Sequence, residues 1–174
     1  MEIINLGATD GLPPVNWENV LEKLDAGSQP APEAHNARTT WLSTLNRDGS
    51  PHVTAVGALW LDESFWFQTG SSTRKARNVA RDPRCSIAVS ILDTDVVAEG
   101  EAERETDPAT LTRLAWAWSD QGWPAELDET RTGITAPFNA PSQGAPPWNV
   151  YRIKPDSVVV TLGTEPGGLT RFRF

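Results

Sequence analysis

The stretch PHVTAVGALWLDESFWFQTGSSTRKARNVARDPRCSIAVS, residues 51–90, decides the fold. Residues 51–61 and 64–70 are rich in Val, Thr, Trp and Phe, a composition typical of β-strands. Residues 72–83 instead have small apolar residues at helical spacing and end at a proline, which predicts an α-helix. Residues 84–92 return to strand composition. This order predicts a β-sheet with a helix inserted between two of its strands.

The residues before this stretch extend the predicted sheet. Residues 39–46 have strand composition, and Asp48-Gly49 predicts a tight hairpin turn, because glycine accepts a positive φ. Since short turns join residues 39–46, 51–61 and 64–70, we expect these three strands to form an antiparallel meander.

The ends of the chain add helices, further strands and one long loop. Residues 1–36 predict an irregular arm, a helix that begins at Trp17, and a Pro-bearing linker over residues 28–36. Residues 107–121 predict a second helix, opened by Asp107 with a proline at its first position. The remaining strands are expected at residues 96–105, 148–155, 157–163 and 169–174.

A long segment without periodicity lies at residues 122–148 and is rich in Pro and Gly. A loop of this length in a compact protein is usually functional, and its apolar residues favour a position over a site. The whole pattern predicts a single domain over residues 1–174, mainly β with flanking helices, whose sheet edges close into a barrel.

The composition excludes several classes of protein. The chain has 15 Lys+Arg against 23 Asp+Glu, and this formal net charge of -8 argues against nucleic-acid binding. We find no signal peptide and no apolar run long enough to span a membrane, and the single Cys85 fits a reducing cytoplasm. The two histidines, His35 and His52, lack metal-ligand spacing, so we expect no metal site.

Positive charge nevertheless gathers in TGSSTRKARN, residues 69–78. Arg74 and Lys75 fall in the first turn of the predicted helix, where the helix dipole disfavours cations. Free backbone N–H groups, neighbouring hydroxyls and these cations together are typical of a phosphate pocket. The alternative is a solvated helix whose basic residues pair with nearby carboxylates.

Residues 51–90, together with the Asp-Gly hairpin, resemble the split β-barrel flavin-binding family of pyridoxamine 5'-phosphate oxidase and its deazaflavin-dependent relatives. The matching elements are a P-H-V-T strand, an aromatic strand that ends in Thr-Gly, and a helix that begins S/T-R-K. The resemblance implies a six-stranded antiparallel split β-barrel with flanking helices. It also implies a homodimer with two cofactor sites at the subunit interface.

The resemblance also assigns site residues. It places the cofactor phosphate on Thr69, Ser71, Thr73, Arg74 and Lys75, and the ring system against Val53, Thr54, Ala55 and Val56. Gln68 stands where the oxidase branch usually has an aromatic residue.

Two departures from the oxidase pattern favour the deazaflavin branch. The strand that begins PHVTAV lacks an early arginine, and the terminal LTRFRF lacks the oxidases' substrate motif. We therefore expect the deazaflavin F420 as cofactor, with FMN as the alternative, and hydride transfer to a flat unsaturated small molecule. A non-catalytic protein that binds a flavin or deazaflavin is a further alternative. No catalytic side chain is identified.

The terminal LTRFRF alternates, so Arg171 and Arg173 share one face of the predicted strand. In one interpretation this is an edge strand whose solvated arginines prevent aggregation. In the other, Arg171 and its neighbour face the cofactor groove and bind the acidic tail of a deazaflavin coenzyme.

Overall fold

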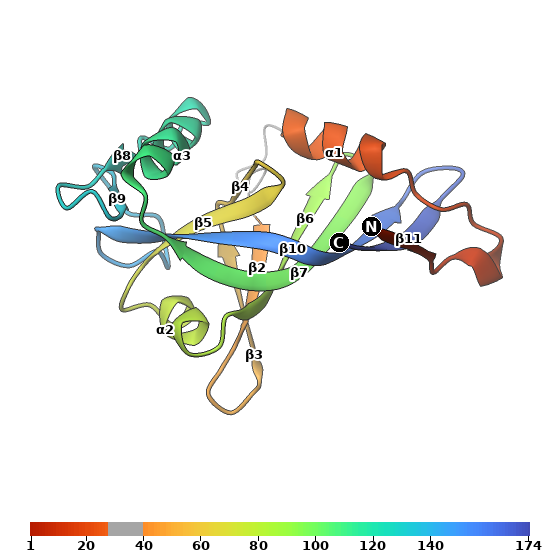
Figure 1. Ribbon diagram of the computed structural model, residues 1–174, viewed down its shortest axis with the longest axis horizontal. Helices are drawn as coiled ribbons and strands as arrows, with labels where there is room; N and C mark the ends of the chain where they lie inside the picture. Colours follow the sequence, from red (N-terminus) through yellow and green to blue (C-terminus); the bar gives the residue numbers. More distant parts are fainter. Residues whose placement is uncertain (28–39) are drawn as a thin grey trace.

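The computed structural model describes residues 1–27 and 40–174, and its architecture is dominated by antiparallel strands (Figure 1). The predicted linker at residues 28–36, with His35, lies outside the described residues. The elements are β1 (Glu2–Asn5), η1 (Ala8–Asp10), α1 (Trp17–Ala26), β2 (Thr40–Leu45), β3 (Pro51–Val56), β4 (Leu59–Leu61), β5 (Ser64–Gly70), α2 (Arg74–Arg81), β6 (Arg84–Ile91), β7 (Thr94–Glu105), α3 (Pro108–Asp120), β8 (Glu126–Leu127), β9 (Ile134–Thr135), β10 (Trp148–Leu162) and β11 (Gly168–Arg173).

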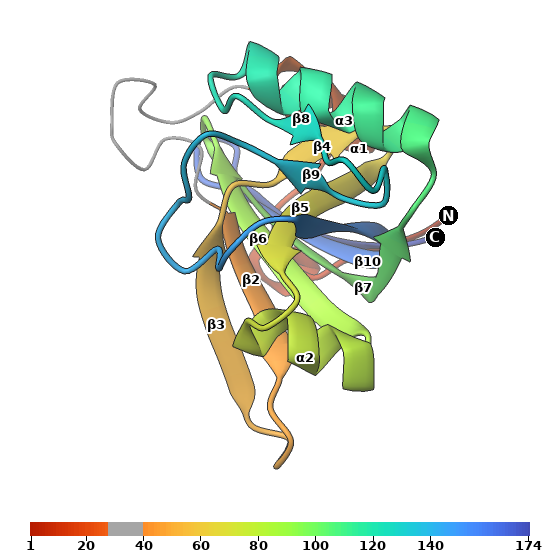
Figure 2. The same cartoon turned by 90° about the vertical axis from the view of Figure 1, so that its left-hand side faces the viewer.

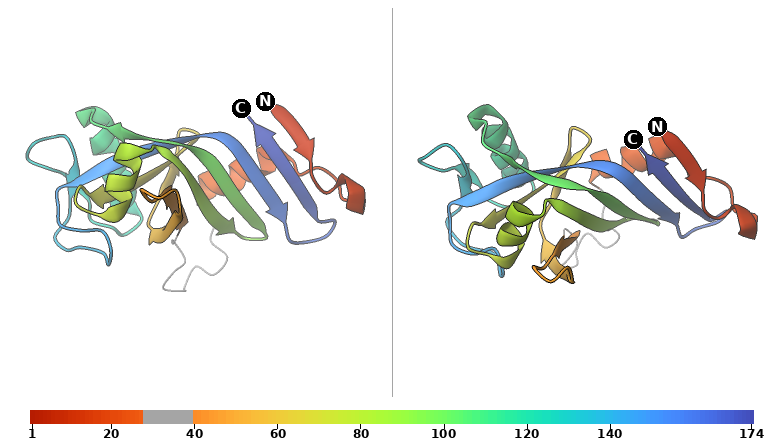
Figure 3. Two further views of the ribbon diagram at one scale, coloured as in Figure 1. Left: turned by 90° about the horizontal axis from the view of Figure 1, so that it is seen from below. Right: turned by 60° about the horizontal axis from the view of Figure 1, so that its bottom comes forward.

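The long strand β10 organises the sheet. Over residues 150–162 it pairs with β7 on one side, and the register shifts at a bulge between Pro155 and Ser157. On its other side, residues 148–153 pair with β5, whereas residues 157–162 pair with β11. The change of partner divides the sheet in two, with β5 and α2 near one end and β1 and β11 at the other (Figures 1 and 3).

The fold class is confirmed: the chain is mainly β, antiparallel, and consistent with a split barrel. The number of strands differs from the expected six, because the described residues form eleven. Short segments account for much of the difference: β1 replaces part of the predicted irregular arm, and the loop after α3 contributes β8 and β9. Conversely, the strands predicted at 148–155 and 157–163 are one continuous strand, β10.

The predicted meander is confirmed in its first antiparallel pair, β2 with β3, but not as a continuous three-stranded unit. The expected strand at residues 51–61 breaks at Gly57-Ala58 into β3 and β4. Whereas β3 pairs with β2, β4 pairs with β5 and leads the chain away from that hairpin. The second neighbour of β2 is β6, so the helix α2 separates two strands that are distant in the sheet.

The predicted helices are confirmed, and each begins at a side-chain cap. Asn16 caps α1, Thr73 caps α2, and Asp107 caps α3, each by accepting a hydrogen bond from a backbone N–H three residues later. In the described residues no helix is both long and apolar enough to cross a membrane.

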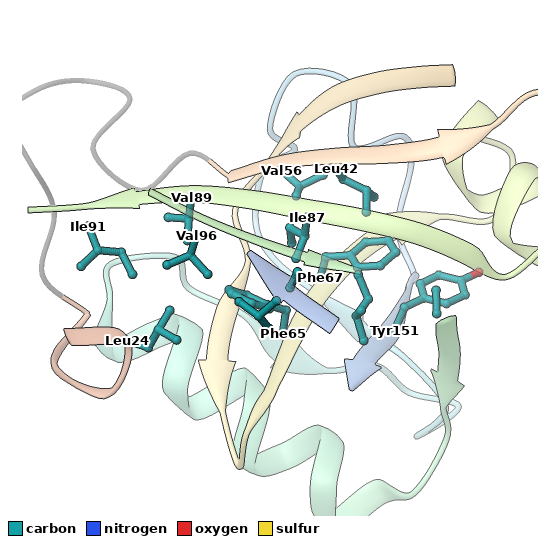
Figure 4. Packing of buried hydrophobic residues seen from close by; sticks show 14 of the residues in the cluster. Leu24, Leu42, Val56, Phe65, Phe67, Ile87, Val89, Ile91, Val96 and Tyr151 are labelled. Atoms are coloured by element: carbon teal, nitrogen blue, oxygen red, sulfur yellow. The ribbon is translucent and has the colours of Figure 1, made fainter. Parts of the chain in front are cut away.

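The core has two parts on the two sides of the β5–β10 ribbon. The barrel interior contains the cluster shown in Figure 4, where Phe67 stacks on Tyr151 with ring centroids 5.1 Å apart. The second cluster packs Leu114 and Trp118 of α3 against Trp148 of β10. Helix α3 and the loop that follows it therefore cover one face of this ribbon (Figure 2).

Candidate functional site

A cavity of about 560 Å³ lies where the end of β3, strand β5, helix α2 and the long loop meet. Most of its lining is apolar or aromatic. The lining residues are Ala55, Val56, Gly57, Ala58, Gln68, Lys75, Trp118, Gln121, Trp123, Ala140, Pro141, Ser142 and Gln143. Four predicted site residues from three separate elements, Ala55, Val56, Gln68 and Lys75, therefore line one cavity.

Lys75 is the charged residue of this cavity. Its side chain is buried, with the residue 4% exposed, although it falls in the first turn of α2. The Nζ atom donates a hydrogen bond to the backbone carbonyl of Ser142 at 2.6 Å, and within the described part of the chain it forms no ion pair. Burial lowers the pKa of the Lys75 ammonium. A cation held in an apolar cavity without an acidic partner is a favourable place for an anionic group.

Two further polar atoms at the cavity lack partners. Gln68 is 8% exposed, and neither its Oε1 nor the indole Nε1 of Trp123 has a hydrogen-bond partner among residues 1–27 and 40–174. The Trp123 ring is held between Phe138 and Trp148, with ring centroids 5.2 Å and 5.9 Å away. Buried polar atoms without partners are uncommon, and here they offer hydrogen bonds to a ligand.

Hydrogen bonds hold the loop segment 140–145 over the start of α2. The backbone N–H of Gly70 donates to the Gln143 carbonyl at 2.7 Å, and the Trp148 indole donates to the Gly144 carbonyl at 2.9 Å. A Cβ added at Gly70 would lie 2.9 Å from the Ala145 carbonyl oxygen, so the close approach requires glycine. The segment 140–145 thus closes one side of the cavity.

The predicted phosphate residues do not all point to the same place. The Thr69 and Thr73 hydroxyls lie 2.9 Å apart, and the Thr73 hydroxyl also caps α2. Both hydroxyls therefore already have partners. Ser71 is exposed in the turn before α2. Arg74 is exposed and does not line the cavity, whereas Lys75 is buried in its wall; the charges of both residues nevertheless act on His52.

Of the predicted ring-binding residues, Val53 and Thr54 lie on β3 but do not line the cavity; Val53 is 57% exposed. Arg171 lies on β11, at the far end of the sheet from α2 (Figure 1). The interpretation of this terminal strand as an edge is wrong, because β11 pairs with β1 on one side and with β10 on the other. The pairing with β1 was not foreseen, since residues 1–15 carry little strand signal.

Several lining residues were missed from the sequence. Gly57 and Ala58 were assigned to the middle of a strand, and Gln143 carried no signal of its own. Trp118 and Trp123 belong to a tryptophan-rich part of the chain, which was a usable signal for an aromatic ligand site.

Two titratable groups outside the cavity are also perturbed. Partial burial lowers the pKa of His52, and the positive charges of Arg74 and Lys75 lower it further. Burial raises the pKa of the Cys85 thiol to about 12, with a contribution from Glu101. Cys85 is therefore a protonated, unreactive side chain at neutral pH.

The fold is a split barrel with a cavity at the start of α2, and comparison with known proteins identifies the family. Residues 31–161, more than half of the chain, match the family model for pyridoxamine 5'-phosphate oxidase. The chain belongs to this family of flavin-binding oxidoreductases. No curated protein matches it.

Solved structures with the same fold have low sequence identity to this chain. General Stress Protein 26 from Bacillus anthracis is 21% identical, with a TM-score of 0.56 over 90% of this chain and 99% of that one. A pyridoxamine 5'-phosphate oxidase-related, FMN-binding protein from Nostoc punctiforme is 16% identical, with a TM-score of 0.58 over 90% of both chains. PhzG from Burkholderia lata is 14% identical, with a TM-score of 0.61 over 98% of this chain and 92% of that one.

Proposed function

We propose that this chain is an oxidoreductase that uses the deazaflavin F420 to reduce a flat unsaturated small molecule. The observation that carries the proposal is Lys75, a buried ammonium without an acidic partner at the wall of a largely apolar cavity. In this proposal the phosphate of the cofactor supplies the missing negative charge.

The residues present fit a cofactor with a ring system and a phosphate. A volume of about 560 Å³ is within the usual range for small-molecule and cofactor sites. Val56 and Ala55 offer an apolar wall to the ring, and the Gln68 Oε1, which has no partner among the described residues, offers a hydrogen-bond acceptor to its polar edge.

A bound F420 supplies a hydride, and a bound FMN supplies one-electron or two-electron chemistry. The protein's own contribution is binding, orientation and exclusion of water. Lys75 fixes the anionic end, and Trp118 and Trp123 restrict access of water to the cavity. In this proposal Trp123, whose Nε1–H has no partner among the described residues, forms part of the wall against which the substrate lies.

FMN is the second candidate cofactor. The Nostoc punctiforme protein that shares this fold is described as FMN-binding. The cavity itself is large enough for a flavin ring with or without the nitrogen that distinguishes FMN from a deazaflavin. A non-catalytic binding protein would need the same cavity, so turnover has to be tested apart from binding.

We also propose a homodimer built on the outer face of the sheet. Pairing registers place one row of side chains across six strands and β1: Ala55, Trp41, Ala88, Val97, Val159, Arg171 and Ile4. The row is mostly apolar, yet Trp41 is 54% and Val97 38% exposed. An exposed apolar row of this length is typical of an interface.

The order of residues along this row matters for the prediction that Arg171 contacts the cofactor. Ala55, a cavity residue, is at one end, and Arg171 lies close to the other. If two copies pack with their two-fold axis parallel to the strands, each Arg171 comes to lie at the partner's Ala55 end. A monomeric mass in light scattering, with cofactor bound stoichiometrically, would contradict this arrangement.

The cofactor proposal is tested by fluorescence and absorbance titration with F420 and FMN. We expect Lys75→Met to weaken binding by roughly tenfold or more, the range for loss of a charge-assisted hydrogen bond. Lys154→Met, which removes an exposed lysine from β10, is the matched control and should bind normally. Failure of the unmodified protein to bind either cofactor, or equal binding by both variants, would refute the proposal.

A further inference from the structure

A second concave surface lies beside α2, and Lys75 is not among its lining residues. It encloses about 640 Å³ and is lined by Asn46, Arg47, Asp48, Arg74, Arg77, Asn78 and Arg81. We call this surface the arginine groove. Three of its arginines recur at intervals of three and four residues along α2, so they lie on one face of the helix. Arg47 adds a fourth guanidinium from the hairpin between β2 and β3.

Most of the positive charge of the arginine groove is not neutralised: its lining has four arginines and one carboxylate, Asp48, which interacts electrostatically with Arg81. In residues 1–27 and 40–174, none of the four arginines forms an ion pair with a carboxylate. Arg77 donates to the backbone carbonyl of Ser72 at 2.8 Å, and Arg81 donates to that of Leu45. Asp48 is the acidic residue of the lining, and its carboxylate accepts hydrogen bonds from Ser50. In a chain with a net charge of -8, four such arginines in one groove mark an anion-binding surface.

The arginine groove begins where the cofactor cavity ends. Lys75 lines the cavity and Arg74 lines the groove, and the two residues are consecutive at the start of α2. The two Cα positions therefore differ by about 100° around the helix axis and about 1.5 Å along it, so the cavity and the groove both reach the first turn of α2. From Arg74 to Arg81 the helix rises about 10 Å, enough for roughly two or three carboxylates along an extended chain.

We infer that the arginine groove binds a flexible polycarboxylate chain attached to the cofactor. The inference rests on the proposed function and decides between its two cofactors, because a deazaflavin coenzyme carries an acidic tail that FMN lacks. It moves the tail from Arg171, where the terminal sequence pattern placed it, to Arg47, Arg74, Arg77 and Arg81.

The test uses deazaflavin coenzymes with one and with five glutamates in the tail, and the deazaflavin without phosphate and tail. Binding to the full chain is measured by fluorescence titration at two salt concentrations. We expect affinity to rise with tail length and the rise to shrink at high salt, because exposed charges are screened. The double variant Arg47→Gln/Arg77→Gln should lose roughly tenfold or more in affinity for the five-glutamate form and keep its affinity for the tail-less form.

The matched control is Arg104→Gln/Lys154→Gln, which removes two exposed cations from β7 and β10. It should bind all forms as the unmodified protein does. Equal affinity for short and long tails, with binding still dependent on Lys75, would overturn this inference and leave the proposed function standing. Absence of binding by any deazaflavin form would instead overturn the proposed function.

A final arm tests the groove alone. Free penta-γ-glutamate should bind weakly to the unmodified protein, as measured by calorimetry, and not to the Arg47→Gln/Arg77→Gln variant. A single-stranded 20-nucleotide DNA that bound more tightly than the peptide would assign the groove to nucleic acid and overturn the inference.

Discussion

The two ends of the sheet treat positive charge differently. At the end that carries α1 and β11, Lys23 lies 2.6 Å from Asp93 and Arg173 lies 3.6 Å from Glu2. At the end that carries α2, Lys75 and the arginines of the groove have no carboxylate partner within the described residues. Arg171 departs from this rule, because its Nε is buried without a partner at the paired end. Arg84, directly after α2, is paired with Asp82, so the contrast concerns Lys75 and the groove arginines and not every cation at that end.

The end of the sheet that carries α2 is stabilised by packing more than by ion pairs. We therefore expect the largest effect on stability from a substitution in its core. Trp148 is fully buried between α3, β9 and the loop, and its indole donates to Gly144. We expect Trp148→Ala to lower the free energy of unfolding by about 3–5 kcal/mol, because it leaves a large cavity. Urea denaturation measures the loss. Trp116→Ala is the control, since Trp116 is 77% exposed, and it should change stability by less than about 0.5 kcal/mol.

A smaller effect is expected at the turn that shapes the loop. The Asp128 carboxylate accepts hydrogen bonds from the backbone N–H groups of Thr130, Thr132 and Gly133. Burial alone would raise the pKa of Asp128, but these bonds and the Thr130 hydroxyl bring it below its usual value. Asp128→Ala should lower the free energy of unfolding by about 1–3 kcal/mol, because it leaves buried donors without a partner.

The Asp128 prediction also carries a pH dependence. Since the folded pKa is lowered, the stabilisation is present at neutral pH and is lost as pH falls below about 4. Denaturation curves at pH 7 and pH 3 should therefore differ less for Asp128→Ala than for the unmodified chain. An unchanged difference would show that the carboxylate contributes nothing to the turn.

The same substitution at the two ends should have opposite effects on the protein without ligand. Lys23→Met removes the paired cation, so we expect the melting temperature to fall by a few degrees. Lys75→Met removes a buried charge that lacks an acidic partner, so the melting temperature should stay constant or rise. Differential scanning calorimetry of both variants gives the comparison. A larger fall for Lys75→Met than for Lys23→Met would contradict the contrast between the two ends.

The smallest expected effect is a change in the titration of His52. Its pKa is lowered by partial burial and by Arg74 and Lys75. An anion at these cations should therefore raise the pKa towards its usual value. Proton NMR of the imidazole, in phosphate and in NaCl of equal ionic strength, measures the change. His52→Gln assigns the signal, and equal titration in both salts would argue against anion binding near Arg74.

The sequence predicted the features that depend on near neighbours. Thr73 and Pro83 bound α2, and Asp107 and Pro108 open α3, as expected; Glu99, Glu101 and Glu103 alternate along the sequence and form an exposed row on β7. Local caps and two-residue periodicity are sufficient for such features.

Features that depend on distant contacts could not be predicted in the same way. Lys75 is buried beneath a loop in which the backbone carbonyl of Ser142, 67 residues later in the chain, accepts its hydrogen bond. No local sequence pattern predicts that contact. Likewise β1 is a strand only because β11 pairs with it. The sequence therefore indicated an anion site at the start of α2. It could not show that Lys75 lines the cavity while Arg74 lines the arginine groove.

The position of β10 near the end of the chain has a consequence for how the protein is made. On a ribosome, β5 and β7 leave the exit tunnel long before β10, the strand that pairs with both. Until β10 arrives, two strands with buried side chains have open edges, a condition that favours aggregation. Yield of soluble protein should therefore be sensitive to synthesis rate and temperature, and a chain that stops before residue 148 should accumulate in the insoluble fraction.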